Sequence, residues 1–179
     1  MNEQLPEFFS SKDSPDSLDS RCAKNPHPMK HLLLLSTALF SASSAMAQTA
    51  AKIEISASDE MKFNTRSFEV TVGQKVTLIF KNTGKIPLAK MGHNLVILKP
   101  DTLVITFATQ CSDPKSGYLP TDPETKKLIF AATKRLGGGE SDTVYFIPKE
   151  PGKYPFICTT PGHFSEMQGV MTVKEKPAP

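Results

Sequence analysis

The sequence predicts an all-β protein, a β-sandwich with Greek-key connections and a short helical insertion. Short segments that alternate apolar and polar residues recur between residues 52 and 174, with turn residues between them. Fifteen prolines and ten glycines among 179 residues also favour a turn-rich β protein over a helical one. Because each sheet has an apolar face to bury, two sheets packed face to face are the expected architecture.

The first predicted strands alternate most clearly. Residues in them switch between apolar and polar at every step, which is typical of strands with one buried face. Turn residues follow the second and third of these segments, at Gly73 and at Asn82–Gly84. We therefore predict three strands in this half of the domain, at residues 52–57, 67–72 and 75–81.

The second half has a more varied pattern. Residues 93–98 are almost all apolar, which indicates a strand buried on both sides. Residues 100–128 break the pattern and predict an insertion, with Asp101 capping a short helix that runs through Phe107. Alternation resumes after the glycine turn at residues 137–139, and the tail from Lys176 is expected to be disordered. The remaining predicted strands are residues 141–147, 153–157 and 168–174.

The N-terminal segment predicts a secretory signal peptide at residues 29–47. A basic start at Lys30 precedes the apolar run Leu32–Phe40, and small residues lead to Ala47, after which cleavage is expected. The apolar run is too short to span a bilayer, and the small-residue ending argues against a buried helix. The predicted location of the mature protein is therefore the periplasm.

The predicted signal peptide divides the rest of the chain into two parts. Residues 1–28 are polar and aperiodic, so we expect a disordered upstream extension. Residues 48–179 form the predicted domain, with 17 Lys and Arg against 13 Asp and Glu, a formal charge of +4. This mild, dispersed charge gives no reason to expect nucleic-acid binding, and no later segment is apolar enough for a membrane span.

Three metal-binding residue types lie within ten residues, between the last two predicted strands. Cys158, His163 and Met167 provide a thiolate, an imidazole and a thioether, the ligands that copper prefers as it cycles between Cu(I) and Cu(II). His93, at the start of the predicted buried strand, offers a second imidazole. Two His and one Cys with a weak axial Met form the blue-copper arrangement, so the sequence predicts one mononuclear copper site.

Other interpretations of these residues compete with this prediction. A disulfide between Cys111 and Cys158 would remove the thiolate, although Cys111 is better explained as a buried apolar residue. A Cys158–His163 nucleophile would leave Met167 unexplained. A binuclear copper site needs a second loop cysteine, which the chain lacks, and Met is not a usual zinc ligand. A copper-binding or storage protein without electron transfer stays open as the alternative function.

Two segments resemble the copper-binding segments of azurins and auracyanins, the blue copper proteins of the cupredoxin fold. They are Met91–Asn94, with the sequence Met-Gly-His-Asn, and Cys158–Met167. The glycine-rich turn and following strand, Leu136–Phe146, is similar as well. The resemblance extends from about residue 52 to about residue 174, and the two metal-binding segments occur in the right order.

The resemblance implies a role for each site residue. His93, His163 and Cys158 would bind copper directly and Met167 would be the long axial ligand. The remaining implied roles belong to neighbours: the carbonyl of Gly92 as a weak opposite axial contact, and Asn94 and Thr159 as hydrogen-bonding residues beside the sulfur. An apolar patch around His163, formed by Ile86, Met91, Pro161 and Gly162, would pass electrons.

The resemblance also implies the function, and the chain departs from azurins in two features. The protein would be a one-electron carrier, not an enzyme, that docks transiently near His163 with redox proteins such as c-type cytochromes. Azurins have an aromatic residue where Thr160 stands, so the reduction potential is not predictable from the family. Their N-terminal disulfide is absent here, because the predicted mature chain has no cysteine before Cys111.

Overall fold

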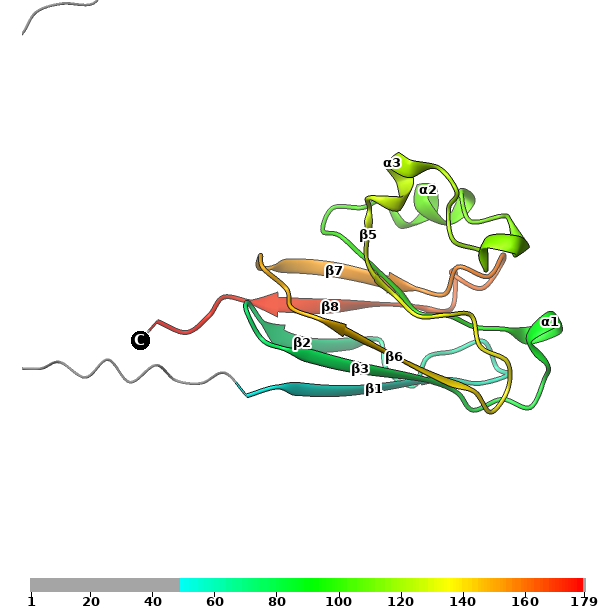
Figure 1. The fold of residues 1–179 in the computed structure, drawn as a ribbon, viewed down its shortest axis with the longest axis horizontal. Helices are drawn as coiled ribbons and strands as arrows, with labels where there is room; N and C mark the ends of the chain where they lie inside the picture. The colour runs from blue at the N-terminus through cyan, green and yellow to red at the C-terminus, as the bar shows by residue number, and fades with distance from the viewer. Residues whose placement is uncertain (1–48, 179) are drawn as a thin grey trace, which may run out of the picture. The chain divides into compact units, whose positions relative to one another are not determined.

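Two β-sheets face each other in the computed structural model, which describes residues 49–178 (Figure 1). The predicted extension (1–28) and signal peptide (29–47) lie outside the described residues. The smaller sheet has the order β1-β3-β6 and the larger one the order β2-β8-β7-β4-β5. The strands are β1 (Ala51–Ala57), β2 (Ser67–Thr71), β3 (Val76–Asn82), β4 (Val96–Leu98), β5 (Ile129–Ala132), β6 (Ser141–Phe146), β7 (Gly152–Ile157) and β8 (Gln168–Lys174).

The chain crosses repeatedly between the two sheets, as the predicted Greek-key sandwich requires. Strand β1 pairs in parallel with β3, and β2 pairs in parallel with β8, whereas the other pairs are antiparallel. Six of the seven predicted strands differ by at most one residue at either end from the observed ones. The predicted fold class is therefore confirmed. The strands could be located from the sequence because strict alternation fixes which face of each strand turns inward.

The main core lies between the sheets and is rich in aromatic and branched side chains. Along β3 every second residue is buried, including Leu78 and Phe80. The ring of Phe63 packs edge-on against Phe80, with centroids 6.0 Å apart, and lies 5.6 Å from the ring of Phe156. Each such buried side chain stabilises the fold by roughly 1.5–3 kcal/mol.

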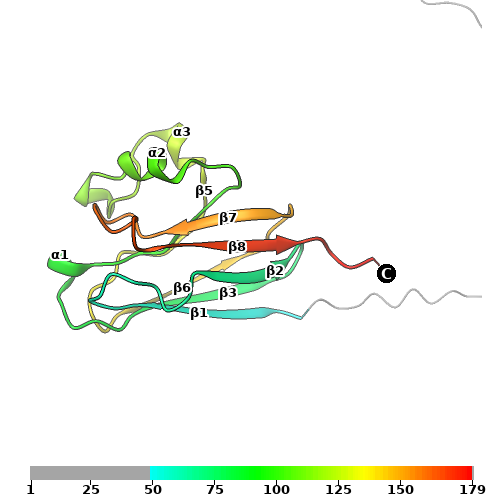
Figure 2. The ribbon, with the colours of Figure 1, turned by 180° about the vertical axis from the view of Figure 1, so that it is seen from behind.

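The insertion lies over the larger sheet (Figures 1 and 2), and a second apolar cluster contains side chains of both. The insertion contains three short helical elements: α2 (Val104–Thr109), η1 (Pro114–Ser116) and α3 (Pro123–Lys126). Val96 and Leu98 of β4 pack into this cluster with Phe107, whereas Ile97 belongs to the main core. Strand β4 is thus buried on both sides, as its continuous apolar sequence predicts.

Several local predictions were wrong or incomplete. Strand β4 begins at Val96 instead of residue 93, because His93 and Asn94 are in the loop that reaches the candidate site. Asp101 does not cap α2: it has a positive φ of 62°, and Leu103 occupies the cap position without a side-chain hydrogen bond. Helix α1 (Leu88–Met91) and strand β5 were not predicted. Among the described residues, no helix is long and apolar enough to cross a membrane.

Candidate metal centre

One loop joins β7 to β8 and carries three of the four predicted ligands. Cys158 directly follows β7, and its backbone N–H donates to the carbonyl of Met167 at 3.0 Å. The N–H of Met167 donates to the carbonyl of His163 at 2.8 Å, and that of His163 donates to Thr160 at 3.0 Å. Gly162 supports the turn with a positive φ of 81°, which glycine adopts at little cost. Backbone hydrogen bonds therefore hold the two ends of the loop together.

His93 reaches the same end of the sandwich from another segment. It forms an isolated antiparallel bridge with Leu136: the N–H of His93 donates at 3.0 Å and its carbonyl accepts at 2.7 Å. The buried side-chain amide of Asn82, at the end of β3, donates to the carbonyl of Leu136 at 3.0 Å. These bonds fix the backbone of His93 without using its imidazole.

Three donor atoms converge in the interior at this end of the sandwich. The Sγ atom of Cys158 lies 3.7 Å from Nδ1 of His163 and 4.0 Å from Nδ1 of His93. The two Nδ1 atoms are 3.2 Å apart. All three residues are buried, and together they are the only group of three or more His, Cys, Asp or Glu residues in the described part of the chain that could hold a metal ion.

These spacings fit a single metal ion. Three ligand atoms bound about 2.0–2.3 Å from one ion and spread about 120° apart would stand about 3.5–3.8 Å from one another. The observed range of 3.2–4.0 Å brackets that value. The Nδ1 atoms of both histidines are the ones that meet at the centre, and the Nε2 atom of His93 is buried without a hydrogen-bond partner. The donor set and its spacing suit copper.

The electrostatic environment keeps both imidazoles neutral, the form that binds metals. Burial lowers the pKa of His93 to about 4, with the charge of His163 adding to the effect, while the backbone of Ser58 and the Asp59 carboxylate oppose it. The pKa of His163 is lowered by burial and then by the Arg135 guanidinium.

Cys158 is held mainly as a thiol in the metal-free protein. Burial raises the pKa of its side chain, and this outweighs the opposing effects of the Asn94 and Thr160 N–H groups and of Arg135. Binding a metal through the thiolate therefore releases a proton into the solvent.

Asn94 and Thr159 join the two segments that supply these side chains. The side-chain amide of Asn94 donates to the hydroxyl of Thr159 at 2.7 Å, and its Oδ1 accepts from the Thr159 N–H at 2.8 Å. All these atoms are buried, where a satisfied polar pair is more rigid than in water. The pair holds the His93 and Cys158 segments in a fixed register.

The remaining predicted ligands, Met167 and Gly92, are both buried in the segments that carry the three converging residues. Met167 is fully buried and belongs to the same core cluster as Cys158. Gly92 is buried, and its carbonyl accepts a hydrogen bond of 2.8 Å from the hydroxyl of Thr160. Of the predicted apolar patch, Pro161 and Gly162 are exposed, whereas Ile86 and Met91 are half-buried.

Sequence reasoning missed a second group of residues around the centre. Arg135 donates from Nε to the hydroxyl of Thr160 at 3.2 Å, and its guanidinium lies 4.9 Å from the centre of the Tyr118 ring. Leu136 and Asn82 position His93, as described above. No local motif marks these residues, because each is brought to the site by strand pairing or by the insertion. The glycine-rich turn after Leu136 was the only nearby signal.

The possible disulfide between Cys111 and Cys158 is ruled out. Both cysteines are free and buried, and they lie in different clusters. The thiol of Cys111 donates a weak hydrogen bond to the carbonyl of Phe107 at 3.4 Å. Cys111 is a small buried residue of the insertion, which agrees with the favoured interpretation.

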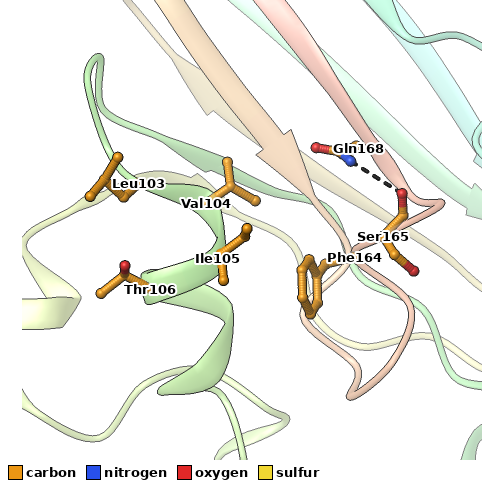
Figure 3. Close-up of a pocket in the computed structure, with 7 residues that line it drawn as sticks. All are labelled: Leu103, Val104, Ile105, Thr106, Phe164, Ser165 and Gln168. Carbon is orange, nitrogen blue, oxygen red and sulfur yellow. Dashed lines mark hydrogen bonds between the residues drawn. The ribbon is translucent and has the colours of Figure 1, made fainter.

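An apolar groove runs beside the loop but contains none of the four predicted ligands. It has a volume of about 710 Å³ and lies between α2 and the residues after His163. Phe164 faces Val104 and Ile105 of α2 across the groove, and the Gln168 amide donates to the carbonyl of Ser165 at 3.1 Å (Figure 3). Phe164 packs on the second cluster, so this groove links the insertion to the loop.

Comparison with known proteins agrees with this geometry. Residues 49–174 match the family model of copper binding proteins, plastocyanin/azurin family, and the chain belongs to this family. The azurin of Alcaligenes faecalis is 35% identical over 127 residues, which are 68% of this chain and 97% of that protein. Family members bind copper, which identifies the centre formed by His93, Cys158 and His163 as a copper site, with Met167 buried in the same core cluster as Cys158.

Other relatives are similar over the same region. The outer membrane protein H.8 of Neisseria gonorrhoeae is 35% identical over 66% of this chain, and the chain spans 65% of that relative's length. A solved structure of auracyanin A, a "blue" copper protein from Chloroflexus aurantiacus, is 32% identical. It covers 70% of this chain and 100% of its own, with a TM-score of 0.62.

Proposed function

We propose that the protein is a one-electron carrier with a mononuclear type 1 copper site. His93, His163 and Cys158 would hold the copper most strongly, and Met167 and the carbonyl of Gly92 would add weaker contacts. Copper held there would supply the redox change, by alternating between Cu(II) and Cu(I). The convergence of three buried donor atoms within 4.0 Å of one another is the observation that carries this proposal.

The surrounding residues suit electron transfer because they keep the ligands in place. The His93 backbone is fixed by its bridge to Leu136, and the Asn94–Thr159 pair locks the two segments together. A rigid ligand set that suits both oxidation states needs little rearrangement when an electron arrives. Burial also excludes water from the sulfur, which protects the thiolate.

His163 is the proposed point of electron entry and exit. It is 8% exposed, whereas His93 and Cys158 are fully buried, so its ring provides the route from the centre to the surface. The exposed residues Pro161 and Gly162 lie beside it in the loop. A redox protein such as a c-type cytochrome would dock there briefly, without a reaction in a substrate, so the protein is not an enzyme.

Export to the periplasm is part of this proposal. The predicted signal peptide (29–47) and the domain beginning at Gln48 would place the site outside the cytoplasm. The similarity to H.8, which is named an outer membrane protein, supports an envelope location. Mass spectrometry of the exported protein should give an N-terminus at Gln48, and detection of residues 1–28 in it would contradict the proposed boundaries.

A potentiometric titration of the copper-loaded protein tests the carrier function. We expect one electron per chain, taken up and released reversibly, with copper retained in both oxidation states. A storage protein would instead lose copper on reduction or exchange it with a chelator at the same rate in both states. Loss of copper during a redox cycle would therefore contradict the proposal.

A further inference from the structure

A groove on the insertion side of the copper site carries mainly positive charge. It has a volume of about 700 Å³ and is bounded by η1 and Leu119 on one side and by residues 132–135 and β6 on the other. Its charged residues are Lys115, Lys134, Arg135 and Asp142. We call this the basic groove, because three cations face it with one carboxylate.

The cations of the basic groove are not neutralised by salt bridges. The ion pairs found between residues 49 and 178 involve none of Lys115, Lys134 and Arg135. The Asp142 carboxylate instead accepts a hydrogen bond of 2.8 Å from the backbone N–H of Lys134. Lys115 and Lys134 are exposed, so their ammonium groups are available to an acidic partner.

The inner end of the basic groove contacts the copper-binding segments. Arg135 donates to the Thr160 hydroxyl, which in turn donates to the carbonyl of Gly92. A Cβ atom at Gly92 would lie only 2.6 Å from the Arg135 guanidinium carbon, so a side chain there would displace the guanidinium from this position.

The insertion holds Arg135 in this position from the other side. The Tyr118 ring lies 4.9 Å below the guanidinium, a cation–π contact worth roughly 0.5–2 kcal/mol. Tyr118 has a positive φ of 60°, directly after Gly117 at 70°, and such backbone strain in a bulky residue costs about 1–3 kcal/mol. The structure therefore keeps a strained turn at the place where the ring supports Arg135.

We propose that the basic groove is a docking site for an acidic surface loop of the protein's redox partner. This inference rests on the proposed electron-carrier function. The groove is larger than a single ion needs, and Leu119 and Leu88 add apolar walls that suit a polypeptide. Carboxylates placed against Lys115 and Lys134 would hold the partner beside Arg135, whose guanidinium reaches Thr160 in the copper-binding loop. Charge complementarity of this kind raises association rates more than it raises affinity.

Stopped-flow oxidation of the Cu(I) protein by an acidic c-type cytochrome tests the inference. One electron passes from Cu(I) to the ferric haem, giving Cu(II) and ferrous haem. The groove variant is Lys115→Glu/Lys134→Glu. The matched control is Lys52→Glu/Lys153→Glu, which makes the same charge change at exposed residues near the first residues of β1 and β7, and Lys153 lies at the end of β7 away from Cys158. Rates are compared at equal concentrations of blue protein.

At an ionic strength of about 0.01 M we expect the groove variant to react at least about tenfold more slowly than the control. This difference should largely disappear at about 1 M, where charges are screened within about 3 Å. A cationic cobalt(III)–phenanthroline oxidant should react no more slowly with the groove variant. This second oxidant separates lost docking from damage to the site, which would slow both reactions.

Equal rates for the groove and control variants would overturn the inference, because net charge alone would then explain any steering. A dimer that dissociates in the groove variant, detected by sedimentation, would also overturn it by assigning the groove to a second copy. Failure of the unmodified copper protein to react with either oxidant would instead contradict the electron-carrier function itself.

Discussion

The two buried cysteines show how different neighbourhoods give one residue type different chemistry. Cys111 is 2% exposed in an apolar cluster, and burial raises the pKa of its thiol to about 11. Cys158 is fully buried and burial raises its pKa as well, but two neutral imidazoles stand within 4.0 Å of its sulfur. Burial alone therefore gives an inert thiol, and the converging histidines make the other one a metal ligand.

The largest expected difference between the two cysteines is in copper affinity. Cys158→Ser should weaken Cu(II) binding by more than about 100-fold, since losing a ligand costs more than losing a residue that supports one. Cys111→Ser should leave the affinity within a few-fold, because its sulfur contacts only the Phe107 carbonyl and apolar side chains. Competition with a chelator of known affinity measures both. Similar losses in the two variants would contradict the comparison.

Damage to the Cys111 cluster should reduce stability without removing the site. Phe107→Ala empties a fully enclosed position and should lower the free energy of unfolding by about 3–5 kcal/mol. The variant should still turn blue with Cu(II). Urea unfolding of the metal-free protein gives the change, with Ile105→Ala, which is 69% exposed, as the control expected to stay within about 0.5 kcal/mol. A colourless Phe107→Ala variant that is still folded would show that the insertion shapes the copper site.

The histidines of the copper site and the buried Cys111 should make stability depend on pH at opposite ends of the range. Between about pH 6.5 and 4 the unfolded chain binds more protons at His93 than the folded chain does, so the stability of the metal-free protein falls as the pH falls. Between about pH 9 and 11 the unfolded chain loses the Cys111 proton first, so stability falls as the pH rises.

Urea unfolding at a series of pH values measures this response. His93→Gln should reduce the slope on the acid side, to which His163 also contributes, and Cys111→Ala should reduce the slope on the alkaline side, to which Cys158 also contributes. An acid side that keeps its slope in His93→Gln would show that the imidazole is not the group that titrates.

The smallest expected effect concerns Thr160. Thr160→Val removes the hydrogen bond to the Gly92 carbonyl, whose oxygen then becomes more available to Cu(II). A net change of about 0.5–1.5 kcal/mol would lower the reduction potential by about 20–65 mV. Thr160→Ser should keep the original potential because it retains the hydroxyl. Voltammetry of both variants checks this, and equal potentials for Thr160→Val and the unmodified protein would show that the hydroxyl has no such role.

The parts predictable from the sequence were those with a local signal. Alternating segments such as residues 168–174 located the strands, and the order Cys158, His163, Met167 indicated copper because three soft or borderline donors share one short loop. The pairing of the strands then brought His93 to the same place. This step needed the fold, since the two segments are 65 residues apart.

Other features had no local signal. Helix α1 is four residues long and has no capping side chain, and β5 is a four-residue strand with only half-buried side chains. Asp101 looked like a helix cap, but the chain turns there through a positive φ and α2 begins later. Arg135 meets Thr160 and Tyr118 only after the insertion has folded back on the sheet.

The absorption spectrum of the Cu(II)-loaded protein, recorded beside that of Cys158→Ser, tests the central claim most directly. A thiolate bound to Cu(II) in a trigonal site gives an intense blue colour, or green if the axial contact is stronger. We predict this colour in the unmodified protein and its complete loss in Cys158→Ser. A colourless Cu(II) complex of the unmodified protein, or a colour that survives in Cys158→Ser, would contradict the account.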